Sequence, residues 1–318
     1  MVLTALAVIF IRDLFALAML VGIYSLLSAS FFVVVDAVDV AFTEAAVGAG
    51  ISTLLLLSTL TLTGRYAKAG GKRTLLGIAV VSATGALLIY ATLDMPEVGS
   101  VDAPVHQHVA PRYINESMQE VGLPNVVTSI LASYRGYDTL GETVVIFTAG
   151  IGVLALLMVA RRRRTTDADT HGSMHQNMIL RVVAKMLIPL ILLFALYVQF
   201  HGDFGPGGGF QAGVIFAAAI ILYAMIFGLS AARKVIKEPL IYGLSAVGVL
   251  LYAGVGVAAM VMGKNYLDYD ALASDPVAGQ HLGVLLVELG VGITVASVMI
   301  IIFFTFAGRS LNERLKRR

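Results

Sequence analysis

The chain has 318 residues, of which 58% are hydrophobic and only 13% are charged, and its mean hydropathy is +0.88. Soluble domains are about 45–50% apolar and about 25% charged, so this composition excludes an ordinary water-soluble protein. The net charge of +2 is too small to indicate a nucleic-acid-binding protein. The absence of cysteine excludes disulfides, cysteine-ligated metals and a cysteine nucleophile.

Apolar runs long enough to cross about 30 Å of hydrocarbon follow one another along the chain. They predict an all-α integral membrane protein with eight full transmembrane helices, at Leu14–Val35, Val40–Leu62, Thr74–Leu93, Thr143–Ala160, Val182–Phe200, Phe210–Ser230, Pro239–Met262 and Leu282–Ala307. Met1–Ile11 is a further, short apolar helix of about 16 Å, either a half-helix or the stub of a longer one.

Polar stretches group these spans into larger units. Residues 94–141 are expected to form an outer loop with one amphipathic helix, Val121–Tyr134, which lies at the membrane interface or on another protein. The basic and polar run that follows the fourth span is the best boundary in the chain. We therefore expect a small module at 1–73, a second at 74–160, a cytoplasmic linker at 161–177 and a four-helix membrane domain at 178–318.

The basic residues predict the orientation in the membrane. All of the 22 lysines and arginines except Arg112, Arg135 and Lys264 fall on one side of the predicted spans. Lysine and arginine are enriched in cytoplasmic loops. We therefore expect a multi-pass protein of a prokaryotic cell (inner) membrane whose C-terminus is cytoplasmic.

Charged side chains within the spans are the first candidates for function, since a charge at mid-membrane costs roughly 2.5–3.5 kcal/mol on insertion scales. Glu44, Glu142 and Glu288 lie in or at the start of three spans. They either carry H⁺ or Na⁺ along a path shielded from lipid, or bind a neighbouring helix in a structural role, which is favoured for Glu142. Lys185 either snorkels to the cytoplasmic surface or faces an acid in the bilayer and relays protons.

The most unusual local sequence is His201–Gly213, at the outer junction of two spans. Small or helix-breaking residues that end one helix and start the next are Pro206, Gly207, Gly208, Gly209 and Gly213. N–H groups at the new helix start could face an anion or a carboxylate. His201 and Asp203 are candidate proton-entry groups. A tight hairpin packed against a partner is an equally open interpretation.

Two histidine pairs could suggest a metal. They are His106 with His108 and His171 with His175, and neither pair has a third ligand at useful spacing. We therefore expect no metal site and no bound cofactor.

Three motifs resemble one family. His201–Gly213, with Val287-Glu-Leu-Gly-Val-Gly292, looks like the B subunit of the multisubunit Mrp-type Na⁺/H⁺ antiporters. Asp39–Gly48 resembles the small module at the C-terminal end of the large A subunit, a module that is a separate subunit in membrane-bound hydrogenases. Tyr134–Glu142 is similar to the next module in that series. The resemblance covers nearly the whole chain as a fusion of three pieces, with Val38 where the family usually has proline.

The resemblance implies a non-catalytic membrane subunit of a cation/proton antiporter. It would contribute to the path of Na⁺ and H⁺ and to assembly, beside large subunits similar to the proton-pumping subunits of complex I. Glu44, Glu142 and Glu288 match acids of the motifs. The alternative is an ion-translocating accessory subunit of a redox-driven complex, such as a membrane-bound hydrogenase or a complex I-like assembly. A purely architectural scaffold is a third, weaker interpretation.

Overall fold

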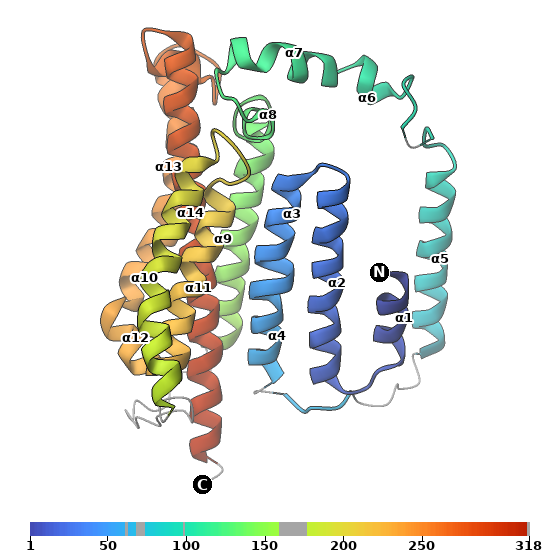
Figure 1. Ribbon diagram of the computed structural model, residues 1–318, viewed down its shortest axis with the longest axis vertical. Helices are drawn as coiled ribbons and strands as arrows, with labels where there is room; N and C mark the ends of the chain where they lie inside the picture. The colour runs from blue at the N-terminus through green and yellow to red at the C-terminus, as the bar shows by residue number, and fades with distance from the viewer. Residues whose placement is uncertain (61–62, 68–73, 98, 159–176, 317–318) are drawn as a thin grey trace.

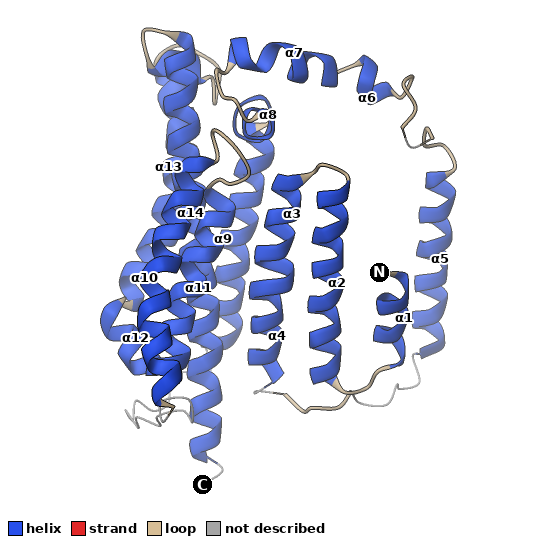
Figure 2. Cartoon of the chain, viewed as in Figure 1, coloured by secondary structure: helices blue, strands red, loops and turns tan. Residues whose placement is uncertain are grey.

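The structure is a computed structural model that describes residues 1–60, 63–67, 74–97, 99–158 and 177–316. Helices are the regular elements of these ranges, and the described chain contains a single β-bridge, between Asp13 and Tyr66, but no strand (Figure 2). Almost all of the expected linker 161–177 lies outside the described residues, and so do His171 and His175.

The predicted all-α membrane fold is confirmed. Within the described residues, 8 helices are long and apolar enough to cross a membrane. They are α2 (Leu14–Val34), the rod formed by α3 (Val38–Glu44), η1 (Ala45–Ser52) and α4 (Thr53–Leu60), α5 (Thr74–Thr92), α9 (Gly136–Met158), α10 (Met178–His201), α11 (Gly209–Phe227), α13 (Glu238–Val261) and α14 (Pro276–Lys316). The shorter elements are α1 (Val2–Phe10), α6 (Pro104–Gln107), α7 (Ala110–Glu120), α8 (Val126–Thr128), η2 (Ser129–Tyr134), α12 (Leu229–Val235) and η5 (Tyr269–Leu272).

The core of the molecule surrounds α14, which packs against α13, α11 and α9 (Figure 1). Its inward face repeats every three to four residues, with Val284, Val287, Val291 and Val295 all buried. Glycines let the partner helices approach closely, as is usual for helix packing in lipid. This compact part of the chain positions the glycine-rich loop between α10 and α11.

The N-terminal spans are more loosely arranged. α2 packs against the rod of α3, η1 and α4, and α1 lies beside α2. α5 stands apart, and none of its described side chains from Leu75 to Thr92 is buried by this chain. The helices α6 and α7 cross one end of the molecule and connect α5 to the core (Figure 1). In the membrane, α5 must therefore be covered by lipid or by another protein.

The two ends of the bundle differ in charge. Arg12, Arg65 and Arg233 lie at the end where α2, α10 and α13 begin, which we call the basic end. The glycine-rich loop and α7 lie at the opposite end, which we call the loop end (Figure 1). Arg65 binds Asp13 at 2.8 Å, and this exposed pair lowers the pKa of the Asp13 carboxyl.

The fourth span begins earlier than predicted. α9 starts at Gly136, about two turns before Thr143, and its first turn is anchored to the core through the backbone. The Tyr252 hydroxyl donates to the Gly136 carbonyl at 2.8 Å, and the Thr143 side chain is buried. Glu142 consequently lies within the helix instead of at its start.

The predicted amphipathic helix Val121–Tyr134 is helical only from Val126 to Tyr134, in α8 and η2, and its first residues are not part of a helix. The surface helix is α7, Ala110–Glu120, and the chain then turns at Gly122, whose φ of 81° is left-handed. Val121 and Leu123 are each 1% exposed. These apolar residues therefore pack into their own chain and not onto an interface or another protein.

Candidate functional site

The glycine-rich loop between α10 and α11 is buried against its neighbours at the loop end. Gly208 adopts a φ of 123°, a region open to glycine, and its N–H donates to the Val198 carbonyl at 3.1 Å. α11 then begins at Gly209 without a side-chain cap. The first N–H groups of α11 are therefore free to bind another partner.

That partner is the carboxylate of Glu288 on α14. The Gly209 N–H donates to it, and a Cβ atom added at Gly208 would lie 3.0 Å from Glu288 Oε1. A Cβ at Gly202 would lie 3.2 Å from Oε2. Only glycines leave room for this carboxylate, which faces the positive end of the α11 dipole. The anion expected at this helix start is thus Glu288, another of the predicted residues.

Glycines also bring α11 and α14 together next to this contact, on the side of the basic end. A Cβ at Gly213 would lie 2.7 Å from the Gly292 carbonyl oxygen, one turn along α14 from Glu288. Within the loop, a Cβ at Gly207 would lie 2.7 Å from the carbonyl oxygen of Val198 on α10, so this glycine lets the loop approach α10. Pro206, by contrast, is exposed on the loop.

Asp203 lies in the same loop and pairs with a residue that the sequence analysis missed. Its Oδ2 is 3.2 Å from Nε2 of His281, which lies two turns before Glu288 on α14. Burial raises the pKa of the Asp203 carboxyl, and the facing His281 partly counteracts this rise. His201, the predicted histidine, instead stacks on Tyr197 with ring centroids 4.9 Å apart.

The segment before α9 holds the loop from one side. Asn125 Nδ2 donates to the carbonyls of Gly202 and Gly205 at 3.1 and 3.0 Å. The Thr128 hydroxyl donates to the Gly202 carbonyl at 2.6 Å. These bonds satisfy buried carbonyls that the irregular loop leaves unpaired.

The N-terminal spans hold the loop from another side. Asp39 Oδ1 accepts from the Gly207 N–H at 3.2 Å, and Gln211 Nε2 on α11 donates to the Thr43 hydroxyl at 2.8 Å. Asp39 and Asp203 both lie close enough to act electrostatically on Glu288. Three stretches far apart in the sequence therefore meet at the glycine-rich loop that holds Glu288.

Glu44 lies on the same rod as Asp39, directly after Thr43, and is half-buried. Its Oε1 and the Ser25 hydroxyl both approach Gly48, where a Cβ would lie 2.7 and 2.6 Å from them. The π-helix η1 begins at the next residue, Ala45. π-helical segments are rare and often occur at functional sites, where they rotate side chains relative to the helix before them.

Glu142 and Lys185 do not reach the residues around Glu288. The side chains of both residues are exposed on the outward faces of α9 and α10. Neither forms an ion pair within the described part of the chain, whereas Arg135 pairs with Asp138 at 2.5 Å. Both charges therefore point toward whatever surrounds this chain in the membrane.

Gln199 is a further polar residue that the sequence analysis missed. It is 8% exposed on α10, and its Nε2 is fully buried without a hydrogen-bond partner in the described structure. A Cβ at Gly292 would lie 2.5 Å from its Oε1. A search of the sequence for glutamines within the predicted apolar spans would have found both this residue and Gln211.

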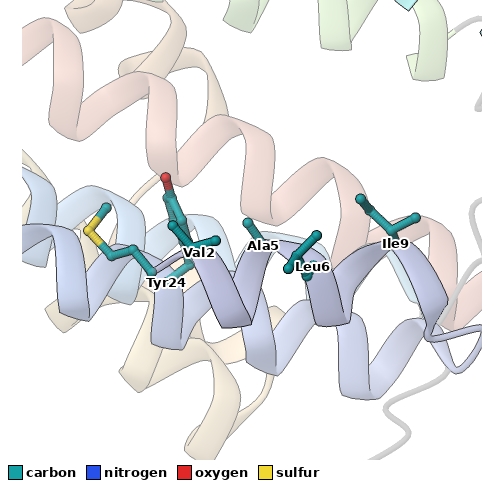
Figure 3. A pocket seen from close by; sticks show the side chains of 6 residues that line it. Val2, Ala5, Leu6, Ile9 and Tyr24 are labelled. Atoms are coloured by element: carbon teal, nitrogen blue, oxygen red, sulfur yellow. The ribbon is translucent and has the colours of Figure 1, made fainter. Parts of the chain in front are cut away.

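A groove beside the N-terminal helix has a different character. Val2, Ala5, Leu6 and Ile9 of α1 and Tyr24 of α2 line it (Figure 3). Its volume is about 410 Å³, and none of the described residues that line it has a charged side chain. It offers an apolar surface to lipid or protein and no carboxylate that could bind a cation.

Family models match three consecutive parts of the chain. Residues 179–301 match a domain related to the MnhB subunit of Na⁺/H⁺ antiporter, residues 1–65 match MbhD, the D subunit of MBH, and residues 72–177 match MbhE, its E subunit. These ranges carry Glu288, Glu44 and Glu142 respectively.

Curated and solved proteins agree with these models. The chain is 26% identical over 258 residues to a probable A/B subunit of a K⁺/H⁺ antiporter from Rhizobium meliloti, covering 74% of this chain but 25% of that protein. It resembles a chain of the Mrp complex from Dietzia sp. DQ12-45-1b with a TM-score of 0.77 and 28% identity, covering 96% of this chain and 34% of that one. The chain thus spans about a quarter to a third of these relatives.

A smaller relative is matched almost completely. The putative antiporter subunit mnhB2 of Staphylococcus aureus strain Newman is 31% identical over 137 residues, which cover 42% of this chain and 95% of that protein. Together with the match of residues 179–301, this shows that the chain belongs to the family of MnhB-related membrane subunits of multisubunit antiporters.

Proposed function

We propose that this chain is a non-catalytic membrane subunit of a multisubunit cation/proton antiporter, in which it forms part of the ion path and joins other subunits. The proposal rests on one observation, the membrane-embedded Glu288 carboxylate held by the glycine-rich loop where the motif-bearing stretches meet. An acid in this setting can exchange a proton for a monovalent cation. The name of the MnhB family model supports Na⁺ as the cation, and that of the Rhizobium relative supports K⁺.

Each embedded charge takes a role in this proposal. Glu288 binds the proton or the cation, and Asp203 with His281 forms the entrance at the loop end. Glu44 is a second acid on the path, next to the π-helix. Glu142 and Lys185 face neighbouring subunits, because an unpaired charge facing lipid would cost roughly 2.5–3.5 kcal/mol at mid-membrane. His201 supports the entrance by stacking on Tyr197.

The organisation and placement of the chain follow the same proposal. Modules at 1–73 and 74–160, a linker at 161–177 and a domain at 178–318 correspond to units that can be separate subunits. The clustering of arginines at the basic end supports a cytoplasmic C-terminus in a prokaryotic cell membrane. Large complex I-like antiporter subunits are the proposed partners, and they would cover the exposed α5.

Purification of the intact complex tests the function. We expect a C-terminally tagged chain, extracted in a mild detergent, to co-purify with large antiporter-like subunits and without redox proteins. Everted vesicles that contain this complex should exchange Na⁺ or K⁺ for H⁺. Co-purification with metal- or flavin-containing subunits would instead favour a redox-driven pump, and a chain that purifies alone would contradict both.

The entrance predicts a change in pH dependence. His281→Gln removes a positive charge that lowers the pKa of Asp203, so that pKa rises further and Asp203 keeps its proton to higher pH. We expect the acidic limb of the exchange–pH profile to move toward higher pH. His106→Gln, at an exposed histidine of α6, is the matched control. A profile unchanged by His281→Gln would remove this pair from the path.

A further inference from the structure

Asn125 binds the carbonyl groups on one side of the glycine-rich loop. Its Nδ2 donates to the Gly202 and Gly205 carbonyls at 3.1 and 3.0 Å, and its backbone N–H donates to the Asp203 carbonyl at 3.0 Å. Its Oδ1 accepts from the Val127 N–H at 2.9 Å, which caps α8. The amide oxygen and both amide N–H bonds therefore have partners, and only a side-chain amide can donate and accept in this way.

The N–H groups on the other side of the loop bind carboxylates. Gly207 donates to Asp39 Oδ1 at 3.2 Å, and Gly209 donates to Glu288. The loop therefore separates its acceptors from its donors, because neutral side chains bind the carbonyls and acids bind the N–H groups. A carbonyl oxygen carries partial negative charge and would repel a carboxylate, so the loop can hold Glu288 only in this orientation.

Gly202 connects the two sides of the loop. Its carbonyl accepts from Asn125 Nδ2 and, at 2.6 Å, from the Thr128 hydroxyl, so both of its lone pairs are used. A Cβ added at Gly202 would lie 2.9 Å from the Gly208 Cα and 3.2 Å from Glu288 Oε2. The residue whose carbonyl these two side chains bind is therefore in contact with the carboxylate and with the start of α11.

We propose that Asn125, together with Thr128, is a positioning residue for the Glu288 carboxylate. By fixing the carbonyl side of the loop, the two side chains fix the direction of the N–H groups that hold Glu288. They are 9% and 4% exposed and lie within residues 72–177, which match MbhE, whereas Glu288 lies within residues 179–301, which match the MnhB-related domain. One module thus orients the acid of the next. The inference rests on the proposed role of Glu288 in the ion path.

Removal of these donors tests the inference in the whole antiporter complex. Asn125→Ser keeps a hydroxyl that can cap α8, but its single O–H cannot donate to two loop carbonyls. Thr128→Val removes only the hydroxyl that donates to Gly202, and Thr128→Ser keeps it. At matched levels of assembled complex, we expect cation/proton exchange to fall about tenfold in Asn125→Ser and less in Thr128→Val. Thr128→Ser should transport at nearly the wild-type rate.

Deuterium uptake by backbone N–H groups gives a second measurement, which separates positioning from general destabilisation. In Asn125→Ser and Thr128→Val, the peptide that spans residues 201–210 should take up deuterium about fivefold faster than in wild type. The reason is that the N–H groups of Gly207 and Gly209 turn away from their carboxylate partners. Peptides from α13 should be unchanged.

Thr143→Val is the matched control. Thr143 is a buried threonine, 1% exposed, whose hydroxyl donates to the Thr139 carbonyl of its own helix and not to the loop. The change removes the same hydroxyl group as Thr128→Val does. It should leave both the transport rate and the deuterium uptake of the loop as in wild type.

The possible outcomes separate this inference from the proposed function. An unchanged transport rate or unchanged deuterium uptake of the loop in Asn125→Ser would overturn the inference, even where Glu288→Gln abolishes transport. If Asn125→Ser does not assemble, Thr128→Val decides in the same way. Faster deuterium uptake throughout the chain, or failure of both variants to assemble, would show a folding role and also overturn it. Transport that persists in Glu288→Gln would instead refute the proposed function.

Discussion

Glu288→Gln is expected to abolish cation/proton exchange while the complex still assembles. The glutamine amide has nearly the same shape as the carboxylic acid, so it fits between Gly202, Gly208 and Gly209. Its amide can still accept from the Gly209 N–H through its oxygen. It cannot take up or release a proton, and it lacks the charge that holds a cation. A loss of at least about 100-fold in exchange rate follows, in line with the removal of an acid that carries the transported proton.

Exchange is measured as the cation-induced change in a pH-sensitive dye in everted vesicles, at matched levels of assembled complex. Glu97→Gln makes the same chemical change at an exposed acid near the loop end and should behave as wild type. Full exchange in Glu288→Gln would assign this acid a structural role. Loss of the complex itself would mean that the negative charge at the start of α11 is needed for folding.

The spans and the candidate acid were predictable because each depends on local sequence. An apolar run of about 20 residues predicts a membrane helix wherever it occurs, and a single charge within it stands out. Glu288 was found in this way. His281 could also have been found, since it precedes Glu288 by two helical turns and must share its face. The late predicted start of α9 came from its polar first turns, where Asp138 and Glu142 are exposed and the Gly136 carbonyl is held by the Tyr252 hydroxyl.

The assembly of the site depends on contacts between distant segments, which local patterns do not encode. Nothing in the sequence around Asp39 indicates that its carboxylate binds the Gly207 N–H, since this bond joins residues 168 positions apart. The contacts of Asn125 with Gly202 and Gly205 are equally remote. In both cases the partner in the loop is a backbone group and not a side chain. No pair of complementary residues in the sequence could therefore reveal the contact.

These backbone contacts connect the loop that holds Glu288 to the other parts of the chain. The loop that holds Glu288 is irregular, and its N–H and carbonyl groups are satisfied by side chains from α3 and α8. A displacement of either segment would change the partners of the loop and, through Gly209, the field at Glu288. Fusion of the segments in one chain would keep these partners together, which favours coupling between subunits that elsewhere can be separate.

Gly213→Ala is expected to destabilise the chain, although alanine normally stabilises a helix interior by roughly 0.5–1 kcal/mol relative to glycine. The added Cβ would lie 2.7 Å from the Gly292 carbonyl oxygen and 2.9 Å from the Val295 Cβ. Neither atom can rotate away, so α11 and α14 must separate. Overpacking of this kind costs about 1–3 kcal/mol, which exceeds the gain in helix propensity. The full chain in detergent should therefore melt at a lower temperature than wild type.

Gly243→Ala on α13 separates this clash from the general effect of alanine, since a Cβ there meets nothing within 4 Å. It should melt at or slightly above the wild-type temperature. Gly292 is one turn from Glu288, so separation of the helices in Gly213→Ala also draws the carboxylate away from Gly208 and Gly209. Exchange should consequently fall further than the amount of folded complex does. Equal melting temperatures for the two variants would mean that α11 and α14 are not in close contact at this point, and the glycine-rich motif would then serve the loop alone.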